Sequence, residues 1–407
     1  MAQRGNTDDS FPVEALGLVS KHLDIDDIKR LMVSSKTLKK RIENSPIIWK
    51  RYMESSHRER SGKYVQAVKK EYLLARSWMR ARETERKSVK YIAAAEVTKM
   101  EVFGDILVVS STLYSVAVYD HHLNHLQTLS GHRGSVWTFD YKDSLLVTGS
   151  TDRTAKIWDC FLGLCVKTLV GHTSTIRCIK IAEGYIITGS RDHTIRVWDI
   201  KTGACKHVLT GHTDSVRDLA LVENMPMCVS ASYDGAAILW NYRTGEGVRC
   251  LIKLPRRMYA VCVSDGQIAT GGMDQILNVL SADGRSLFKS KDHTSTIFNI
   301  QRDKTNGVYT LTTDGTLSRW DLQKKELTYT IETLSKVVGF CVLDHLVVIG
   351  TSSKILLYKK YSGVYVRAIE TVSQLYTLSA TEDALFFASK TAAPSLSTEI
   401  HTLHFKR

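Results

Sequence analysis

Short runs of alternating apolar and polar residues fill the chain from about residue 97 to its end. Runs such as Tyr185-Ile186-Ile187-Thr188 and Ile195-Arg196-Val197-Trp198 are bounded by turn residues, which is the pattern of β-strands in sequence. Residues 10 to about 54 differ, because their apolar residues recur at helical spacing. The pattern therefore predicts a helical N-terminal part followed by a long all-β part.

One motif recurs through the β part at a fixed interval. A Gly-His dipeptide is followed by a turn aspartate and then by a tryptophan. The turn aspartates, weaker copies included, are Asp152, Asp192, Asp234, Asp274 and Asp314. A period of about 40 residues with these signatures is typical of propeller blades. Adding the strand runs on either side, we predict eight blades, with seven as the alternative. We expect a strand near residues 89–93 to close the last blade, because an unclosed ring leaves sheet edges exposed.

The histidines of the motif predict a structural role rather than a ligand-binding one. The array resembles WD40 proteins, in which the histidine, a strand hydroxyl, the turn aspartate and the tryptophan form one hydrogen-bonded chain within a blade. A charged aspartate that accepts such bonds is held strongly and fixes the turn. We assign this role to His132, His172, His212 and His293. Turns that have lost the motif, as at Asp274, are expected to be held less firmly.

Composition and motifs favour a non-catalytic protein. The chain contains no Gly-rich phosphate loop, nucleophile elbow or metal-spaced His/Cys set, so we predict no catalytic residue, no metal site and no cofactor. No run approaches 18 apolar residues, so we expect no membrane partner. Eight cysteines without Cys-x-x-Cys spacing favour reduced thiols in the nucleus or cytoplasm. The net charge of +13 is compatible with an acidic partner and with nucleic acid.

The N-terminal part resembles an F-box. Its matching segments are Phe11-Pro12-x-x-Ala15-Leu16, Leu23-Asp24-x-Asp26-Asp27-Ile28, Val33-Ser34-x-x-x-Leu38 and Ile48-Trp49. The family's module binds the Skp-type adaptor of cullin-based ubiquitin ligases. The resemblance implies an adaptor contact through Phe11, Pro12, Leu16, Val19, Leu23, Ile28, Leu31, Val33 and Trp49. The alternative is an ordinary helical cap domain.

We therefore expect an α+β multidomain protein. Its predicted parts are a disordered N-terminus at 1–9, an F-box at 10–54, a helical linker at 55–90 and a WD40 propeller at 91–407. The linker is basic, but acidic residues interspersed in it favour a solvated helix surface over an RNA contact.

Equivalent positions of successive blades lie on one circle around a propeller's axis. The fifth residue after each motif histidine gives Trp137, Arg177 and Arg217, with Tyr259 and Phe298 in degraded copies. The position before each turn aspartate gives Thr151, Arg191, Tyr233, Met273 and Thr313, and Arg153 follows Asp152. Three guanidiniums with few carboxylates should attract an anion, and arginine's planar fork suits phosphate. Local ion pairing stays open for Arg217, which has Asp214 and Asp218 close in sequence.

The segments around these arginines are similar to the phosphodegron-reading F-box/WD40 receptors, which recognise cyclin E and Notch-like substrates. The resemblance implies that Arg177, Arg191 and Arg217 bind the central phosphothreonine. It assigns supporting roles to Arg153, Ser174, Thr175 and Tyr233, and a place along the groove to Trp137 and Tyr259. The blade-eight arginine that would read a second phosphate is replaced by Leu375-Tyr376, so a second phosphate contact stays open.

These observations predict the substrate-recognition subunit of an SCF-type E3 ubiquitin ligase. Its expected partners are the Skp-type adaptor, through it a cullin/RING ligase, and phosphorylated protein substrates destined for ubiquitination and proteasomal degradation. Only nine residues precede the F-box and heptads are lacking, so we expect a monomer outside the ligase. The alternatives are a basic WD40 scaffold outside any ligase, with RNA as a partner, and a ligase receptor for unphosphorylated substrates.

Overall fold

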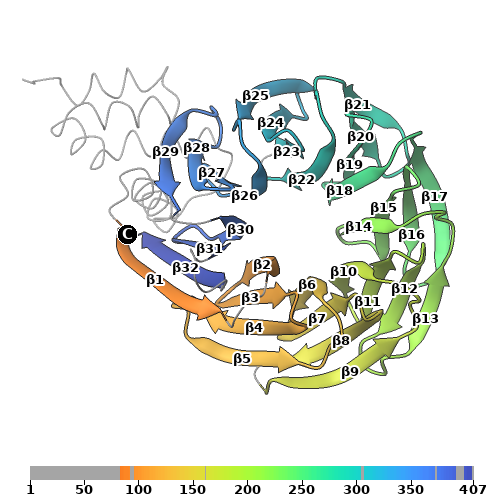
Figure 1. Cartoon of the computed structure of the whole chain (residues 1–407). Helices are drawn as coiled ribbons and strands as arrows, with labels where there is room; N and C mark the ends of the chain where they lie inside the picture. The colour runs from red at the N-terminus through yellow and green to blue at the C-terminus, as the bar shows by residue number, and fades with distance from the viewer. Residues whose placement is uncertain are drawn as a thin grey trace, which may run out of the picture. The chain divides into compact units, whose positions relative to one another are not determined.

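The computed structural model describes residues 83–91, 96–160, 162–303, 307–371, 374–390 and 398–405. The predicted F-box, its nine adaptor-contact residues and most of the predicted linker lie outside the described residues. The described residues form 32 strands, which pair antiparallel into eight four-stranded sheets. These sheets are the blades of a ring whose inner strands face a common axis (Figure 1).

The first four blades follow the chain from the innermost strand outward. Blade one contains β2 (Val97–Phe103), β3 (Ile106–Ser111), β4 (Ser115–Asp120) and β5 (His125–Ser130). Blade two contains β6 (Val136–Lys142), β7 (Leu145–Ser150), β8 (Thr154–Asp159) and β9 (Leu164–Val170). Blade three contains β10 (Ile176–Ala182), β11 (Tyr185–Ser190), β12 (Ile195–Asp199) and β13 (Cys205–Leu209). Blade four contains β14 (Val216–Leu221), β15 (Met227–Ser232), β16 (Ala236–Asn241) and β17 (Glu246–Lys253).

The remaining blades continue in the same order, and the last one also takes a strand from the beginning of the described chain. Blade five contains β18 (Met258–Ser264), β19 (Gln267–Gly272), β20 (Leu277–Ser281) and β21 (Ser286–Ser290). Blade six contains β22 (Ile297–Arg302), β23 (Gly307–Thr312), β24 (Thr316–Asp321) and β25 (Glu326–Glu332). Blade seven contains β26 (Val337–Val342), β27 (Leu346–Thr351), β28 (Lys354–Lys359) and β29 (Tyr365–Glu370). Blade eight contains β30 (Leu375–Ala380), β31 (Ala384–Lys390), β32 (Thr398–Phe405) and β1 (Glu83–Tyr91).

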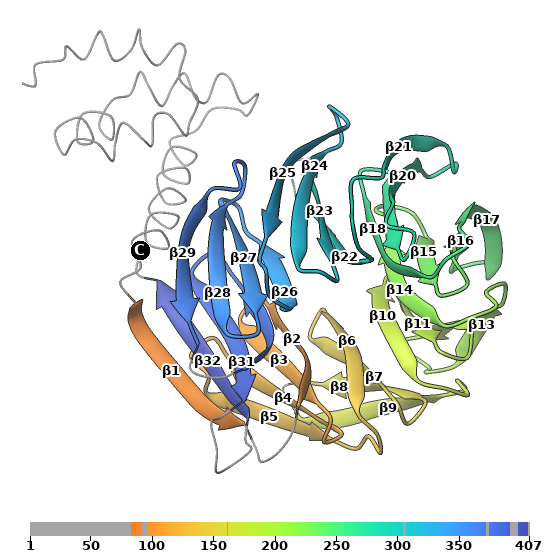
Figure 2. The same cartoon turned by 45° about the horizontal axis from the view of Figure 1, so that its top comes forward.

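The ring is closed by β1, which pairs antiparallel with β32 and places Val89 opposite Ile400. Figure 2 shows the two strands side by side at the outside of blade eight. The expected closing strand and the eight blades are confirmed. The predicted boundary of the linker was wrong, however, because residues 83–90 belong to this strand rather than to a helix. Pairing along the whole of β32 satisfies backbone groups that would otherwise form an open sheet edge.

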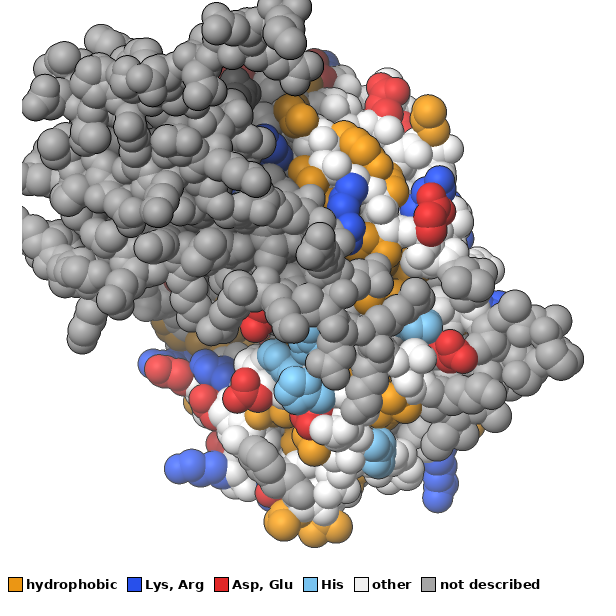
Figure 3. Space-filling model, turned by 90° about the vertical axis from the view of Figure 1, so that its left-hand side faces the viewer, with side chains coloured by type: hydrophobic (Ala, Val, Ile, Leu, Met, Phe, Trp, Pro, Cys, Tyr) orange, Lys and Arg blue, Asp and Glu red, His pale blue; other side chains and the backbone are white. Residues whose placement is uncertain are grey.

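Histidines also join the two blades that meet at this closure. His404 Nε2 lies 3.0 Å from the backbone carbonyl oxygen of His121, in the turn after β4. The rings of His122 and His404 lie 5.3 Å apart. In Figure 3 several His side chains gather on this side of the ring. Side chains therefore connect blade eight to blade one, in addition to the β1–β32 ladder that completes blade eight itself.

The hydrophobic core lies between neighbouring blades rather than at one centre. Val147 and Ile157 of blade two pack with Ile176 and Trp198 of blade three in one buried cluster. Because each sheet buries both faces against its neighbours, its second strand is apolar over most of its length, as in β7 and β11. Each blade thus depends on the next one for its burial, as expected of a repeat architecture.

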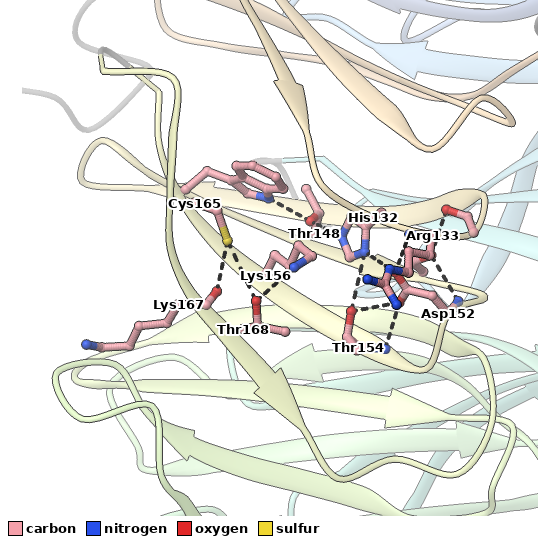
Figure 4. A network of polar contacts seen from close by, with 12 residues as sticks. His132, Arg133, Thr148, Asp152, Thr154, Lys156, Cys165, Lys167 and Thr168 are labelled. Carbon is pink, nitrogen blue, oxygen red and sulfur yellow. Dashed lines mark hydrogen bonds and ion pairs between the residues drawn. The ribbon is translucent and has the colours of Figure 1, made fainter.

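The turns of blades two, three and four are fixed by the predicted hydrogen-bond chain, here called the blade relay. In blade three, His172 Nδ1 lies 2.7 Å from Asp192 Oδ2, and His172 Nε2 lies 2.8 Å from Thr188 Oγ1. The indole N–H of Trp198 donates to the same Thr188 hydroxyl oxygen at 2.9 Å. Figure 4 shows the blade-two copy, in which His132 lies between Asp152 and Thr148. The structural role predicted for His132, His172 and His212 is confirmed.

Blades five and six lack a complete relay. His293 Nε2 reaches Thr310 at 2.7 Å, but His293 Nδ1 has no hydrogen-bond partner among the described residues. Burial lowers the pKa of His293 to about 4. In blade five, Asp274 Oδ2 is buried without a hydrogen-bond partner in the described chain, and burial raises the pKa of this carboxyl. The expectation that the Asp274 turn is held less firmly agrees with these contacts.

Candidate functional site

All eight blades carry the same backbone hydrogen bond at one end of their inner strands. In blade three the amide of Arg191 donates to the carbonyl of Thr175 at 2.9 Å, and in blade four Tyr233 donates to Ser215 at 3.0 Å. The corresponding donor–acceptor pairs elsewhere are Thr112–Glu96, Thr151–Ser135, Met273–Arg257, Thr313–Thr296, Ser352–Lys336 and Lys390–Gln374. The positions before the turn aspartates therefore lie on one circle, as the repeat predicts.

A β-bulge sits at the second residue of every inner strand. The ladder register shifts between Ile176 and Cys178, and between Val216 and Asp218, so that Arg177 and Arg217 are the extra residues. A bulge commonly re-aims a side chain. The first residue of each inner strand is buried, whereas none of the bulged residues is. The bulged residues are Thr98, Trp137, Arg177, Arg217, Tyr259, Phe298, Val338 and Tyr376.

Arg177 lies at the centre of a cluster of cations. Its guanidinium is half-buried, and its Cζ lies 5.6 Å from the ring of Trp137, a side chain that is 41% exposed. Burial, followed by repulsion from Arg217 and Arg191, lowers the pKa of Arg177. Arg177 and Arg217 lie at the bulges of neighbouring inner strands, and the Arg191 amide donates to Thr175 just before the first of them, so the three arginines share one small region. We call Arg177, Arg191 and Arg217 the arginine cluster.

The carboxylates near this cluster are bound elsewhere. Asp214 accepts the amide of Ser215 at 2.6 Å, and Asp218 accepts those of Leu219 at 2.9 Å and Val261 at 3.1 Å. No carboxylate of the described residues forms an ion pair with a member of the arginine cluster. The sequence left open a local ion pair of Arg217 with Asp214 or Asp218, and these contacts show no such pair.

Aromatic residues border the cluster on the side of blades four and five. The rings of Tyr233 and Tyr259 lie 5.1 Å apart. Trp137 contacts Arg177, Tyr259 is the bulged residue of blade five, and Tyr233 occupies the position of Arg191 in blade four, so these aromatic residues border the arginine cluster.

The remaining predicted residues lie around this group. Ser174 and Thr175 are half-buried and immediately precede β10, where the Ser174 carbonyl accepts the hydroxyl of Ser190 at 3.2 Å. Arg153 is exposed in the blade-two turn, with a φ of 70°. No ion pair or cation–π contact of the described residues involves Arg153, so its supporting role stays a prediction.

Sequence reasoning missed Arg257, Leu113 and Tyr114. Arg257 Cζ lies 5.0 Å from the ring of Tyr233. Blade five has no Gly-His dipeptide, so its repeat is hard to align, although Arg257 stands only two residues before the predicted Tyr259. Leu113 and Tyr114 are 49% and 48% exposed in the blade-one turn, which lacks the aspartate that marks the turns of blades two to six. They follow Thr112, whose carbonyl accepts the hydroxyl of Ser135, two residues before Trp137, at 3.3 Å.

The described residues contain no helix that is long and apolar enough to cross a membrane. The same residues contain no group of three or more His, Cys, Asp or Glu side chains that could hold a metal ion.

The fold is an eight-bladed β-propeller, and blades two, three and four carry the relay that is typical of WD40 repeats. The family model described as "WD domain, G-beta repeat" matches residues 123–159, 163–199 and 203–241, which include the three turns with a complete relay. No F-box is found by the same comparison. Propellers of this class are typically non-catalytic scaffolds for protein interactions.

Several curated proteins are similar to parts of this chain. WD repeat-containing protein pop1 of Schizosaccharomyces pombe is 30% identical over 175 residues, which are 38% of this chain and 23% of that protein. Eukaryotic translation initiation factor 3 subunit I of Candida glabrata is 43% identical over 67 residues, 16% of this chain and 19% of that protein. F-box/WD repeat-containing protein 2 of Homo sapiens is 47% identical over 47 residues, 12% of this chain and 10% of that protein. The chain thus spans less than a quarter of the length of each relative.

A solved structure supports the fold alone. The computationally designed Ika8 protein superimposes with a TM-score of 0.69 and 22% identity, covering 77% of this chain and 98% of that one.

Proposed function

We propose that this protein is the substrate-recognition subunit of an SCF-type ubiquitin ligase and that its propeller binds a phosphorylated degron. The observation that carries the proposal is the arginine cluster, which lacks ion pairs to carboxylates of the described residues and is bordered by aromatic side chains. A phosphothreonine brings about −1.5 to −2 charges and three acceptor oxygens. Its binding relieves the repulsion among the three guanidiniums and forms several charge-assisted hydrogen bonds.

The proposed role in the ligase is to hold the substrate rather than to perform chemistry. Arg177, Arg191 and Arg217 bind the phosphate, Trp137 and Tyr259 contact the flanking residues, and Ser174, Thr175, Tyr233 and Arg153 support the bound segment. The F-box binds the Skp-type adaptor and so connects the substrate to the ubiquitin-conjugating enzyme. Holding two reactants together converts their encounter into an effectively intramolecular step.

One set of observations supports a role in a ubiquitin ligase, and another supports a scaffold outside any ligase. The N-terminal residues resemble an F-box, and one partly similar relative is named F-box/WD repeat-containing protein 2. Another is a translation initiation factor subunit, which favours the alternative of a basic WD40 scaffold outside any ligase, with RNA as a partner. Co-purification of a Skp-type adaptor with the full chain supports the ligase role. Nucleic acid without the adaptor supports the scaffold.

Charged substitutions in the predicted F-box test the adaptor contact. Leu23→Glu and Leu31→Glu are each expected to abolish co-purification of the adaptor, because a docked apolar face tolerates no unpaired charge. The melting temperature of the propeller and its binding of phosphopeptide should not change. The control Gln66→Glu, which makes the same change in net charge outside the predicted F-box, should keep the adaptor. Unchanged adaptor recovery with both leucine variants would contradict the F-box assignment.

A further inference from the structure

One turn of blade four departs from the repeat. The motif histidine and the turn aspartate are 20 residues apart in blades two and three but 22 apart in blade four. In blade three, a turn of two residues connects Ala182 to its ladder partner Tyr185. In blade four, residues 223–226 connect Val222 to Met227, whose carbonyl accepts the Val222 amide at 2.9 Å. The two additional residues therefore lie in the turn between β14 and β15.

This longer turn lies at the opposite end of the inner strand from the arginine cluster. Arg217 is the second residue of β14, and the turn follows the last residue of that strand, Leu221. A strand rises about 3.3 Å per residue, so about 15–20 Å separate Arg217 from the turn. A side chain bound at the turn therefore leaves the proposed phosphate-binding surface free.

A pocket of about 520 Å³ lies beside the longer turn. Binding pockets commonly have volumes of about 300–1,000 Å³. The apolar part of the lining comes mainly from blade four, with Leu221, Val222, Met225, Pro226 and Tyr242. Met225 belongs to the longer turn and is 52% exposed, and methionine adapts its shape to different ligands. The longer turn thus adds an apolar wall to a pocket of ligand size.

One carboxylate of this lining has no cation to balance it. Glu183, in the corresponding turn of blade three, pairs with Arg243 at 3.3 Å. No hydrogen bond or ion pair joins Glu223 to another residue in the part of the chain that the structure describes. The other cation of the lining, Lys142, ends the inner strand of blade two, so blade three separates it from Glu223. The pocket therefore favours a positive charge beside Glu223.

We propose that this pocket binds a lysine or arginine side chain of a partner protein. Such a side chain combines an apolar stem with a charged head. Its stem packs against Met225 and Pro226, and its head binds the Glu223 carboxylate. The pair of Arg243 with Glu183 shows that a guanidinium reaches a carboxylate of the same lining. An acidic side chain beside Glu223 would instead meet a like charge.

Methyl NMR with the full-length protein, labelled at its methionine methyl groups, tests the pocket. The probes are blocked tripeptides with arginine, lysine, glutamine or glutamate between two leucines, and Met225→Leu assigns the Met225 resonance. We expect the arginine and lysine peptides to shift this resonance saturably. They should bind roughly tenfold tighter than the glutamine peptide, the effect of one charge-assisted contact. The difference should shrink at an ionic strength of about 1 M, which screens the charges.

Three outcomes would overturn the proposal. Equal affinity of the arginine and glutamine peptides would show that Glu223 attracts no cation. Tightest binding of the glutamate peptide would show that Lys142 and Arg243 select an anion instead. Absence of a saturable shift with all four peptides would show that the pocket binds none of these side chains.

Substitutions assign the preference to Glu223. Glu223→Gln should lower the affinity of the arginine peptide to that of the glutamine peptide, without a change in melting temperature, because Glu223 is exposed. The matched control is Glu246→Gln, which makes the same change in charge on β17 of the same blade, outside the pocket lining. This control should keep the preference. A preference that persists in Glu223→Gln would place the bound cation elsewhere and overturn the proposal.

Binding at this pocket does not depend on the phosphodegron function. Glu223→Gln should bind a Thr-Pro phosphopeptide with the affinity of the native protein, because the two sites lie at opposite ends of the inner strands. A native protein that prefers the arginine peptide but binds no phosphopeptide would overturn the phosphodegron function alone. Weaker phosphopeptide binding by Glu223→Gln would contradict the separation of the two sites.

Discussion

Replacing Arg177, Arg191 or Arg217 by alanine is expected to weaken binding of a Thr-Pro phosphopeptide tenfold to a hundredfold. Each guanidinium is proposed to give the phosphate a charge-assisted hydrogen bond, and such a bond contributes about 1.5–3 kcal/mol net. Stability should not fall, because the three cations repel one another and form no ion pair with carboxylates of the described residues. Calorimetry for binding and thermal melting for stability measure the two effects separately.

The matched control lies on another strand of blade three. Arg196 is part of β12, and its Nη1 contacts Cys205 Sγ at 3.7 Å rather than the arginine cluster. Arg196→Ala should therefore bind the phosphopeptide like the native protein. If the unphosphorylated peptide binds as tightly as the phosphorylated one, the degron is not read through its phosphate.

The propeller could be predicted from the sequence because every blade with a complete relay uses the same side chains to form the same hydrogen bonds. Thr188 needs donors and acceptors in a buried site, and His172 and Trp198 supply them at fixed sequence offsets. The offsets recur about every 40 residues and reveal which side chains share a circle. The association of Arg177 with Trp137 and Arg217 follows from this periodicity alone.

Blade five was harder to predict because it has lost these chemical constraints. Leu280 stands opposite Ile268 in the ladder, where blades two, three, four and six have a tryptophan. Without an indole donor and a histidine, the Thr270 hydroxyl has no hydrogen-bond partner among the described residues. Blade five therefore has no recognisable motif by which its residues could be aligned with those of the other blades. The backbone hydrogen bond from Met273 to Arg257 is what shows that Arg257 lies on the circle.

The closing strand shows a second limit of local sequence. Residues 83–91 read ETERKSVKY, which is mostly polar and lacks a clear strand alternation. Its conformation is determined by the free edge of β32, which begins more than 300 residues later. A long-range partner therefore outweighs local preference here.

Replacing the turn aspartate should affect the free energy of unfolding differently in a blade with a complete relay and in a blade without one. Asp192→Asn is expected to reduce the free energy of unfolding by about 2–4 kcal/mol at neutral pH, because buried donors lose an acceptor. The Asp192 carboxylate accepts bonds from His172, from the amide of Thr173, and from both the amide and the hydroxyl of Thr194. Asp274→Asn should leave stability unchanged or raise it, because that carboxylate has one buried, unpartnered oxygen.

The pH dependence of the two variants should have opposite signs. Burial would raise the pKa of Asp192, but hydrogen bonds led by that from His172 hold this pKa well below its ordinary value. Its stabilisation is therefore present above the unfolded pKa of about 3.9 and lost as the pH falls below it. Burial raises the pKa of Asp274, so its ionisation in the folded state opposes folding as the pH rises through its ordinary range.

Thermal melting of the native protein and both variants between pH 3.5 and pH 8 measures these effects. The difference between the native protein and Asp192→Asn should begin to shrink toward the acidic end, because Asp192 takes up a proton in the unfolded state while it stays charged in the folded state. Any advantage of Asp274→Asn should instead appear as the pH rises. Equal destabilisation by both substitutions at neutral pH would show that the relay contacts do not set the stability of the turn, since Asp274 has no histidine partner to lose.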